Sequence, residues 1–377
     1  MIYLDYAATS FKKPESVYKT LGTLTRKLSA NAGHGASTLA MAASAHVYDA
    51  AEQAALLFGI SSPENIAFTN NTTLALNMAI KGAAGAGGHI IMTSMEHNSV
   101  ARPVYACGAD YTIVRADSTG IVNPQNIEKA IRANTSLVVV NHASNVCGSI
   151  QDIDTIGQIC KERRVLFLVD SAQSAGVLDI DVERQNIDML AFAGHKSLMG
   201  PLGTGGLYVR DGLRLSTILE GGSGSNSESA YQSEFMPDRL VSGTMNMPAI
   251  AALGEGIKFV RKIGTEEILG HERLLSRRFR DGLRNIDGVT VYGAESEKSV
   301  GVVSMNVEGK SCVETARLLD SEYKIAVRGG LHCAPLAHGT IGTLESGGTV
   351  RFSFGYYTTR AHVDSALRAV SEIARGK

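Results

Sequence analysis

A cysteine lies beside a histidine in the glycine-bracketed stretch VRGGLHCAPL, residues 327–336. Arg328 precedes Cys333 in this stretch, and Arg351 follows it in the chain. A polar, glycine-rich loop favours exposure of the thiol, and a nearby basic side chain can lower its pKa, which makes the reactive thiolate more available. Local sequence leaves two interpretations open, a packed structural thiol or a nucleophile.

A lysine follows a strand-like run directly in DMLAFAGHKSLMGPLGTGGLYV. Most lysines at strand ends are solvated surface residues. Lys196, however, is preceded by FAGH and followed by glycines that let another group approach the backbone. Partial desolvation lowers the pKa of a lysine and frees its amine, which suits Schiff-base chemistry.

Other polar residues also follow predicted strands. Asp170 ends VLFLVD, where it could cap a helix or pair with a protonated pyridine nitrogen. Thr72 and Thr73 lie where a strand gives way to a helix, a position that suits capping or phosphate binding. His97 follows HIIMTS, where its ring could stack on a flat cofactor, and Asn145 follows SLVVVN. Together these features match the requirements of pyridoxal 5′-phosphate (PLP).

The elements that would position these residues alternate from about residue 45 to 250. Strand-like runs such as NIAFTN, HIIMTS and SLVVVNHAS are separated by amphipathic stretches such as PQNIEKAIRA. This alternation predicts an α/β fold with a mostly parallel central sheet flanked by helices. Ligands collect at the carboxyl ends of the strands in such sheets, where the polar residues lie.

A second, smaller α+β unit is predicted after a long Gly/Ser-rich connection at residues 212–247. Helix-like runs and short strands then follow to the end of the chain. We therefore expect a large domain at residues 16–250 and a small domain at 251–377 that also includes the N-terminal segment 1–15.

Bulk properties exclude several classes of protein. The 377 residues carry a formal net charge of -1, which gives no electrostatic basis for binding nucleic acid or an anionic membrane. No run approaches the ~20 apolar residues of a membrane span, and MIYLDYAATS lacks the features of a signal peptide. Five scattered cysteines without a CxxC pair fit a reducing compartment. We expect a cytoplasmic protein.

No metal site is expected. A site built from His332, Cys333 and His338 is disfavoured, because their spacing does not match the paired spacing of zinc motifs.

Several motifs occur in an order that resembles a known family. MEHNS, SNVCG, VDSAQ, GHK with GPLGTGGLY, SGT and RGGLHCAP are similar to motifs of the group II cysteine desulfurases, members of the class V aminotransferases and of fold type I PLP enzymes. The resemblance extends from YLDYAATSFKKP to VRFSFGYYTT. It implies conversion of L-cysteine to L-alanine, with the sulfur held as a persulfide before it passes to an acceptor protein.

The resemblance also implies roles for cofactor-binding residues. Lys196 would form the Schiff base, Asp170 would pair with the pyridine nitrogen, and the ring of His97 would stack on the cofactor. The remaining cofactor contacts would come from Gln173, Asn145, Thr72, Thr73, His195 and, from the neighbouring subunit of a homodimer, Thr244.

Substrate binding and sulfur transfer are assigned by the same resemblance. Arg351 would bind the substrate carboxylate, since guanidinium geometry matches a carboxylate, and Asn145 would contact the substrate. Cys333 would accept the sulfur, with Arg328 and His332 shaping its loop.

Two departures from the family pattern affect these expectations. Ala193 stands three residues before Lys196, where the family has Ser or Thr, so one hydrogen bond to phosphate is missing. NAGHGAST, containing His34 and Ser37, replaces the usual HRGxH, and neither residue is assigned a role.

Three alternatives remain open from the sequence. The first two are enzymes on the same scaffold: a selenocysteine lyase, whose substrate would be L-selenocysteine, or another class V aminotransferase reaction. The third is a binding protein that has lost catalysis.

Overall fold

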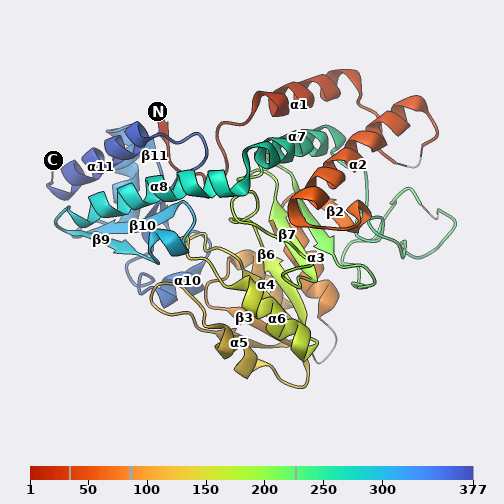
Figure 1. Cartoon of the computed structure of the whole chain (residues 1–377), viewed down its shortest axis with the longest axis horizontal. Helices are drawn as coiled ribbons and strands as arrows, with labels where there is room; N and C mark the ends of the chain where they lie inside the picture. Colours follow the sequence, from red (N-terminus) through yellow and green to blue (C-terminus); the bar gives the residue numbers. More distant parts are fainter. Residues whose placement is uncertain (34, 85–87, 226, 377) are drawn as a thin grey trace.

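The computed structural model describes residues 1–33, 35–84, 88–225 and 227–376, and its largest element is a seven-stranded sheet (Figure 1). The strand order is β2-β8-β7-β6-β5-β3-β4. β3 to β7 are mutually parallel, whereas β8 is antiparallel to both of its neighbours. The predicted α/β fold with a mostly parallel sheet is confirmed. The strands are β2 (Ile66–Thr69), β3 (His89–Thr93), β4 (Asp110–Val114), β5 (Thr135–Asn141), β6 (Leu166–Asp170), β7 (Met189–Ala193) and β8 (Gly205–Val209).

The central strands are apolar without interruption because helices cover both faces of the sheet. Successive side chains point to opposite faces, so in β5 Leu137 and Val139 join one hydrophobic cluster while Val138 and Val140 join the other. The first of these clusters also contains side chains of α3 (Thr72–Ala83) and α4 (Asn98–Ala106). The second contains those of α2 (Thr38–Phe58), α5 (Pro124–Ala130), α6 (Ile153–Arg163) and α7 (Met247–Ile263).

Local sequence explains several helix ends in this layer. The side chain of Ser37 caps α2, which ends at Gly59 in the left-handed conformation (φ 64°). Ser37 thus has a structural role, while His34 of NAGHGAST lies outside the described residues. Asn71 caps α3 by accepting a hydrogen bond from the amide of Leu74 (2.9 Å).

The C-terminal part has a separate antiparallel sheet of order β12-β13-β10-β9. Helices α8 and α11 pack together beside it (Figure 1). The strands are β9 (Val289–Tyr292), β10 (Val302–Val307), β12 (Arg328–Gly330) and β13 (Thr349–Ser353). The helices are α8 (Thr265–Arg284), α9 (Cys312–Ser321), α10 (Pro335–Thr340) and α11 (Arg360–Ala374), and short 3-10 turns lie at Pro63–Asn65 and Ser296–Lys298.

The N-terminal segment joins this C-terminal part. Strand β1 (Ile2–Tyr3) pairs in parallel with β11 (Ile325–Ala326), after which the chain enters α1 (Glu15–Lys27), which packs on α7. The proposed domain division remains a prediction, and α7 runs through position 250 without a break. The described residues between β8 and α7 form neither helix nor strand, as expected for the Gly/Ser-rich connection.

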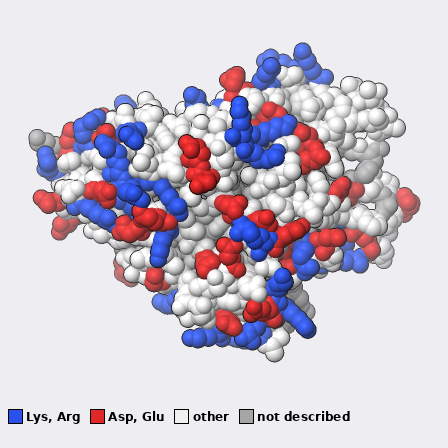
Figure 2. Space-filling view, viewed as in Figure 1, with Lys and Arg blue, Asp and Glu red and all other residues white. Residues whose placement is uncertain are grey.

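Charged side chains of both signs are mixed over the face seen in Figure 2. In the part of the chain that the structure describes, no helix combines the length and the apolar composition that a membrane span requires.

Candidate active site

Most of the predicted cofactor-binding residues line one cavity at the carboxyl edge of the central sheet. They follow β2, β3, β5, β6 and β7, whose carboxyl ends lie at this edge. The cavity is lined by Thr72, Thr73, His97, Asn145, Asp170, Gln173, His195 and Lys196.

Lys196 lies three residues beyond β7, and its side chain faces this cavity. Burial lowers its pKa to about 8; the carboxylate of Asp170 opposes that shift, and the positive charges of Arg351 and Arg328 add to it. A much larger fraction of the amine is therefore neutral at physiological pH than for an ordinary lysine. This is the form that attacks a carbonyl carbon.

Asp170 ends β6 and is 5% exposed. Its Oδ1 accepts a hydrogen bond from the amide of Ala172 (2.9 Å). Burial nevertheless raises its pKa, and among the described residues it forms no ion pair within 4 Å. A buried carboxyl group without a cation is costly when ionised. A protonated ring nitrogen in the cavity would supply the missing charge.

His97 belongs to a chain of polar contacts at the start of α4. Its Nδ1 accepts from the amide of Ser99 (3.0 Å) and lies 2.9 Å from Ser99 Oγ, which is 2.8 Å from Thr73 Oγ1. Burial and the charge of Lys196 lower the pKa of His97 to about 4. The ring is therefore neutral and fixed in orientation, which suits stacking on a flat, charged group.

Groups that could bind an anion also line the cavity. Thr72 and Thr73 are the first two residues of α3, so their hydroxyl groups accompany the unsatisfied amides of a helix N-terminus. His195 is neutral as well, since burial lowers its pKa to about 4, and its Nδ1 lies 3.1 Å from Thr9 Oγ1. Ala193, at the end of β7, adds no hydroxyl group.

Two buried amide oxygens of the cavity, Asn145 Oδ1 and Asn141 Oδ1, have no hydrogen-bond partner among the described residues. The other ends of these side chains are fixed: Asn145 Nδ2 donates to the carbonyl of His332 (2.7 Å) and Asn141 Nδ2 to that of Met95 (2.8 Å). Buried polar atoms normally have a hydrogen-bond partner, so these two oxygens could accept a hydrogen bond from a bound ligand. The side chains present thus fit PLP.

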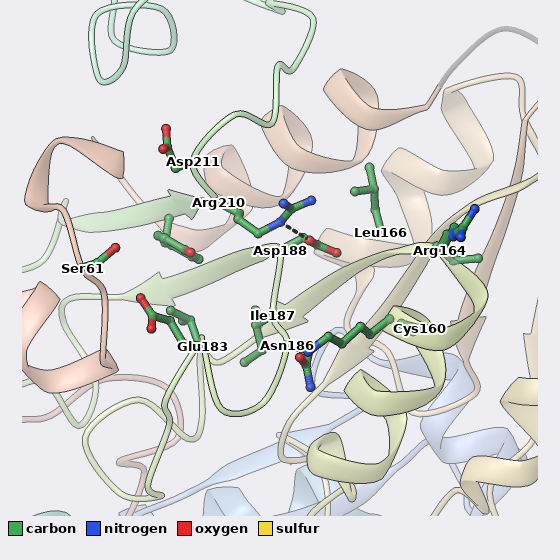
Figure 3. Close-up of a pocket in the computed structure, with 14 residues that line it drawn as sticks. Ser61, Cys160, Arg164, Leu166, Glu183, Asn186, Ile187, Asp188, Arg210 and Asp211 are labelled. Atoms are coloured by element: carbon green, nitrogen blue, oxygen red, sulfur yellow. Dashed lines mark hydrogen bonds and ion pairs between the residues drawn. The ribbon is translucent and has the colours of Figure 1, made fainter.

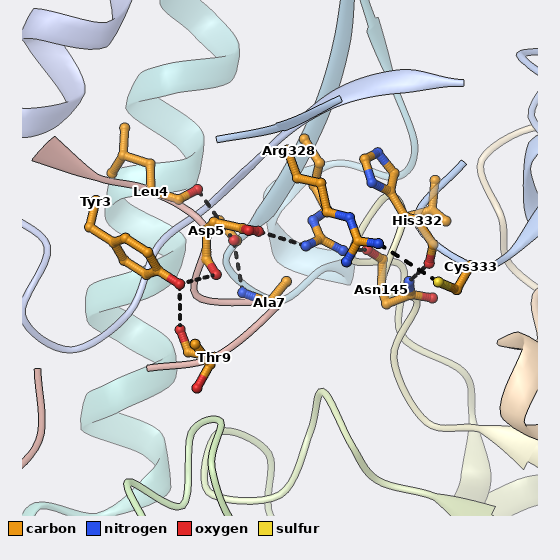
Figure 4. A network of polar contacts seen from close by, with 12 residues as sticks. Tyr3, Leu4, Asp5, Ala7, Thr9, Asn145, Arg328, His332 and Cys333 are labelled. Atoms are coloured by element: carbon orange, nitrogen blue, oxygen red, sulfur yellow. Dashed lines mark hydrogen bonds and ion pairs between the residues drawn. The ribbon is translucent and has the colours of Figure 1, made fainter. Parts of the chain in front are cut away.

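Cys333 lies in an exposed loop that is tied to the cavity wall (Figure 4). Its carbonyl accepts from the amide of Asn98 (2.7 Å), and the neighbouring carbonyl of His332 accepts from Asn145. Both Cys333 and His332 have left-handed backbones (φ 57° and 49°), an uncommon conformation for residues other than glycine. Tertiary contacts therefore hold the thiol in a strained loop.

The two basic neighbours of the thiol differ. Arg328 Nη2 lies 3.7 Å from the sulfur of Cys333. The ring of His332 is buried instead, with Nε2 donating to the carbonyl of Thr349 (3.1 Å), and burial lowers its pKa to about 2. The neutral ring of His332 therefore carries no positive charge toward the thiol, so Arg328 is the basic neighbour that acts on it.

Arg351 in β13 is buried, and its Nη1 donates to the carbonyl of Asn145 (2.9 Å). Its Nη2 contacts Asp5 Oδ1 at 2.6 Å, an ion pair that the sequence did not indicate. Gln173 Nε2 donates to the carbonyl of Ala7 (3.0 Å). The N-terminal segment therefore contacts side chains assigned to this site.

Thr244 is not part of this cavity. It is exposed in the loop before α7, so its predicted contact with a neighbouring subunit's site remains a prediction.

A larger cavity of ≈ 600 Å³ lies at the opposite, amino-terminal edge of the same sheet (Figure 3). Asp188 there pairs with Arg210 (2.6 Å) and also accepts from the amide of Phe167 (2.8 Å).

Across the described ranges, no cluster of three or more His, Cys, Asp or Glu could hold a metal ion, so the set around Cys333 gains no support as a metal site.

Comparisons with known proteins agree with this geometry. Residues 2–366 match the model of the family "Aminotransferase class-V". This chain belongs to the class V aminotransferase family. A relative described as a probable cysteine desulfurase from Methanothermobacter thermautotrophicus is 34% identical over 99% of this chain and 94% of its own length. The cysteine desulfurase IscS of Vibrio campbellii is 34% identical over 98% and 91%.

Solved structures in this family have the same fold. The apo structure of a cysteine desulfurase from Thermococcus onnurineus has a TM-score of 0.92 at 33% identity, with 100% of this chain and 95% of that chain covered. The Escherichia coli cysteine desulfurase CsdA has a TM-score of 0.89 at 25% identity, over 99% and 94%. The resemblance inferred from the motifs is confirmed at the level of the family and of the fold.

Sequence reasoning missed Ser99, Asn141 and Asp5. Ser99 and Asn141 stand within or next to strand ends that were already of interest, in MEHNS and SLVVVN, so their positions gave a usable signal. Asp5 gave no signal in the local sequence, because its partner Arg351 lies 346 residues away.

Proposed function

We propose that this chain is a PLP-dependent cysteine desulfurase that converts L-cysteine to L-alanine and transfers the sulfur to Cys333 as a persulfide. One observation supports this most directly: the loop carrying the exposed thiol is hydrogen-bonded through Asn145 to the cavity that contains Lys196 and Asp170. A thiol, a Schiff-base lysine and a pyridinium partner are the groups this reaction needs.

PLP, when bound, supplies an electron sink that stabilises negative charge at the substrate Cα. The residues that would hold it divide by chemistry. Lys196 would bind it covalently, Asp170 would pair with its ring nitrogen, and His97 would stack on its face. Its polar substituents would be bound by Thr72, Thr73, His195, Gln173 and Asn145.

The residues of this chain then have separate tasks. Arg351 binds the substrate carboxylate, which fixes the Cα proton near Lys196. The lowered pKa of Lys196 lets its amine remove that proton at physiological pH. The Cys333 thiolate, with Arg328 nearby, attacks the substrate sulfur. An S–S bond forms as the substrate C–S bond breaks, and the proton released by the thiol is balanced by one gained at the methyl group of alanine.

The test is anaerobic formation of L-alanine from L-cysteine with a thiol reductant, in wild type and Cys333→Ala. We expect alanine from the wild type alone, with the cofactor absorbance retained in both. Cys107→Ala is the matched control, since Cys107 is partly exposed and lies outside the cavity, and it should keep full activity.

Other outcomes point elsewhere. Alanine from both proteins would indicate direct elimination, and L-selenocysteine would be the next substrate to test. Alanine from neither, with cofactor bound, would indicate another class V aminotransferase reaction. Failure of the wild type to bind the cofactor would favour a binding protein.

We also propose a homodimer, supported by exposed apolar side chains of α2 and by an apolar hollow beside this helix. Leu39, Met41 and Leu56 of α2 are each about 60% exposed. Residues of α2 and of the Gly/Ser-rich connection, including Val241 and Met245 on either side of Thr244, line a common apolar hollow. A second copy that covers this region would bring Thr244 to an interface. Sedimentation equilibrium should give twice the mass of one chain, and a monomer would contradict the proposal.

Exposure of Cys333 further supports transfer of the sulfur to an acceptor protein, because the persulfide would be accessible from outside. The scattered free cysteines fit a reducing compartment, and we infer a cytoplasmic location.

A further inference from the structure

The guanidinium group of Arg351 is held from two sides by segments far apart in the sequence. Nη1 donates to the carbonyl of Asn145 (2.9 Å), after β5, and Nη2 contacts Asp5 (2.6 Å), next to β1. Nε is buried and has no hydrogen-bond partner in the described part of the chain. A guanidinium has five N–H donors, so these two contacts fix its plane and leave donors for a ligand.

Asp5 is itself rigidly placed (Figure 4). It forms a parallel β-bridge with Ser353, two residues beyond Arg351. Its carbonyl accepts from the amide of Ala8 (3.0 Å) and from the hydroxyl of Tyr3 (3.0 Å). Backbone pairing with the strand of Arg351 therefore places the carboxylate of Asp5 next to the guanidinium group. The side chain of Asp5 is 18% exposed.

We propose that Asp5 is a positioning residue that orients Arg351 to bind the α-carboxylate of the amino-acid substrate. This inference rests on the proposed function, in which Arg351 is the carboxylate-binding residue. A buried guanidinium that loses its acidic partner is left with an uncompensated charge and reorients to find another. The two-point contact that a carboxylate needs is then lost.

The alternative is that Asp5 merely anchors the N-terminal segment, but that segment has other anchors. The amide of Ala7 donates to Ser353 Oγ (2.8 Å). Thr9 Oγ1 and the amide of Ser10 both donate to the carbonyl of His195 (3.0 Å each). The segment should therefore stay docked when only the side chain of Asp5 is changed.

The charges around Arg351 make its partner important. Burial lowers the pKa of Arg351, the charge of Arg328 adds to that shift, and Arg328 also contributes to the lowered pKa of Lys196. The carboxylate of Asp5 offsets part of this positive charge at Nη2 of Arg351, the nitrogen that it contacts. This ion pair also keeps the guanidinium group of Arg351 in one orientation.

The experiment uses the PLP-loaded full chain and follows the cofactor absorbance during titration with L-alanine and, separately, with L-alaninamide, which lacks the carboxylate. We expect Asp5→Ala to weaken L-alanine binding about tenfold, the range for a hydrogen bond to a charged group, and to leave L-alaninamide binding within about twofold. Asp5→Asn keeps an acceptor oxygen and should restore L-alanine binding to within about threefold of wild type.

Two reference variants calibrate the measurement. Arg351→Ala should abolish the preference for L-alanine over L-alaninamide. Glu15→Ala removes an exposed carboxylate near the same segment and should change neither affinity. Thermal unfolding of each variant checks that the loaded protein remains folded.

The proposal is overturned if Asp5→Ala binds L-alanine as wild type does, or if it loses affinity for both ligands equally, which would indicate an anchoring role. The titration does not depend on turnover. Absence of alanine formation from L-cysteine would refute the desulfurase function alone. Normal turnover without a ligand-specific effect would refute the role of Asp5 alone.

Discussion

The cavities at the two edges of the central sheet differ in whether their buried polar groups have partners. At the amino-terminal edge, both oxygens of Asp188 are paired, one with Arg210 (Figure 3) and the other with the amide of Phe167. At the carboxyl edge, Asp170 forms no ion pair with the described residues, and Asn145 Oδ1 is buried without a partner. The smaller cavity, at the carboxyl edge, contains these unsatisfied groups. Unsatisfied polar groups are a better indication of a ligand site than cavity volume, which would favour the other edge.

Burial also has opposite chemical consequences at the two edges. Burial raises the pKa of the Cys160 thiol, beside the larger cavity, to about 12, so this thiol stays protonated and unreactive. Burial lowers the pKa of Lys196 to about 8, which increases the reactive neutral amine. The same desolvation therefore suppresses a nucleophile at one edge and activates one at the other.

The largest difference is expected when a lysine is removed from each edge. Lys196→Ala should reduce alanine formation by at least about 10³-fold, because the group that binds the cofactor and moves the proton is lost. Lys161→Ala, at the other cavity, should retain wild-type activity. Both are measured by alanine release, and equal activity of the two variants would contradict the assignment of the carboxyl edge.

The pKa of Lys196 predicts how cofactor loading depends on pH. Only the neutral amine attacks PLP, so the rate of loading of the cofactor-free protein should rise about tenfold per pH unit below pH 8 and level off above it. Absorbance changes after mixing, from pH 6 to 9.5, measure this rate. A rate that keeps rising tenfold per unit up to pH 9.5 would indicate an ordinary lysine pKa instead.

The smallest effect on activity is expected at Asp188. Asp188→Ala leaves the amide of Phe167 without its acceptor and should lower the free energy of unfolding by about 1–3 kcal/mol, with activity within about twofold of wild type. Arg210→Ala removes only a half-exposed partner and should cost about 0–1 kcal/mol. Denaturant unfolding measures both; a well-folded Asp188→Ala protein without activity would show that this edge contributes to function.

Much of the carboxyl-edge site could be predicted because its geometry follows from strand order. Asp170 ends β6 and Asn145 follows β5; the two strands are adjacent and parallel, so their carboxyl ends must meet. Thr72 and Thr73 were recognisable from the change of strand to helix. The position of Thr244 did not follow from this rule, since it lies in a long connection and is exposed.

The sequence by itself determined the alternation of strands and helices and the identity of the residues at strand ends, because periodicity and turn chemistry act over a few residues. Only the tertiary structure decided that Asp5 pairs with Arg351, that the ring of His332 turns away from Cys333, and that the thiol loop has a left-handed backbone. Asp5 and Arg351 are 346 residues apart, the thiol loop is held by Asn98 and Asn145, and the ring of His332 contacts Thr349 in β13. These contacts join separate segments of the chain, and no local preference selects one such partner over another.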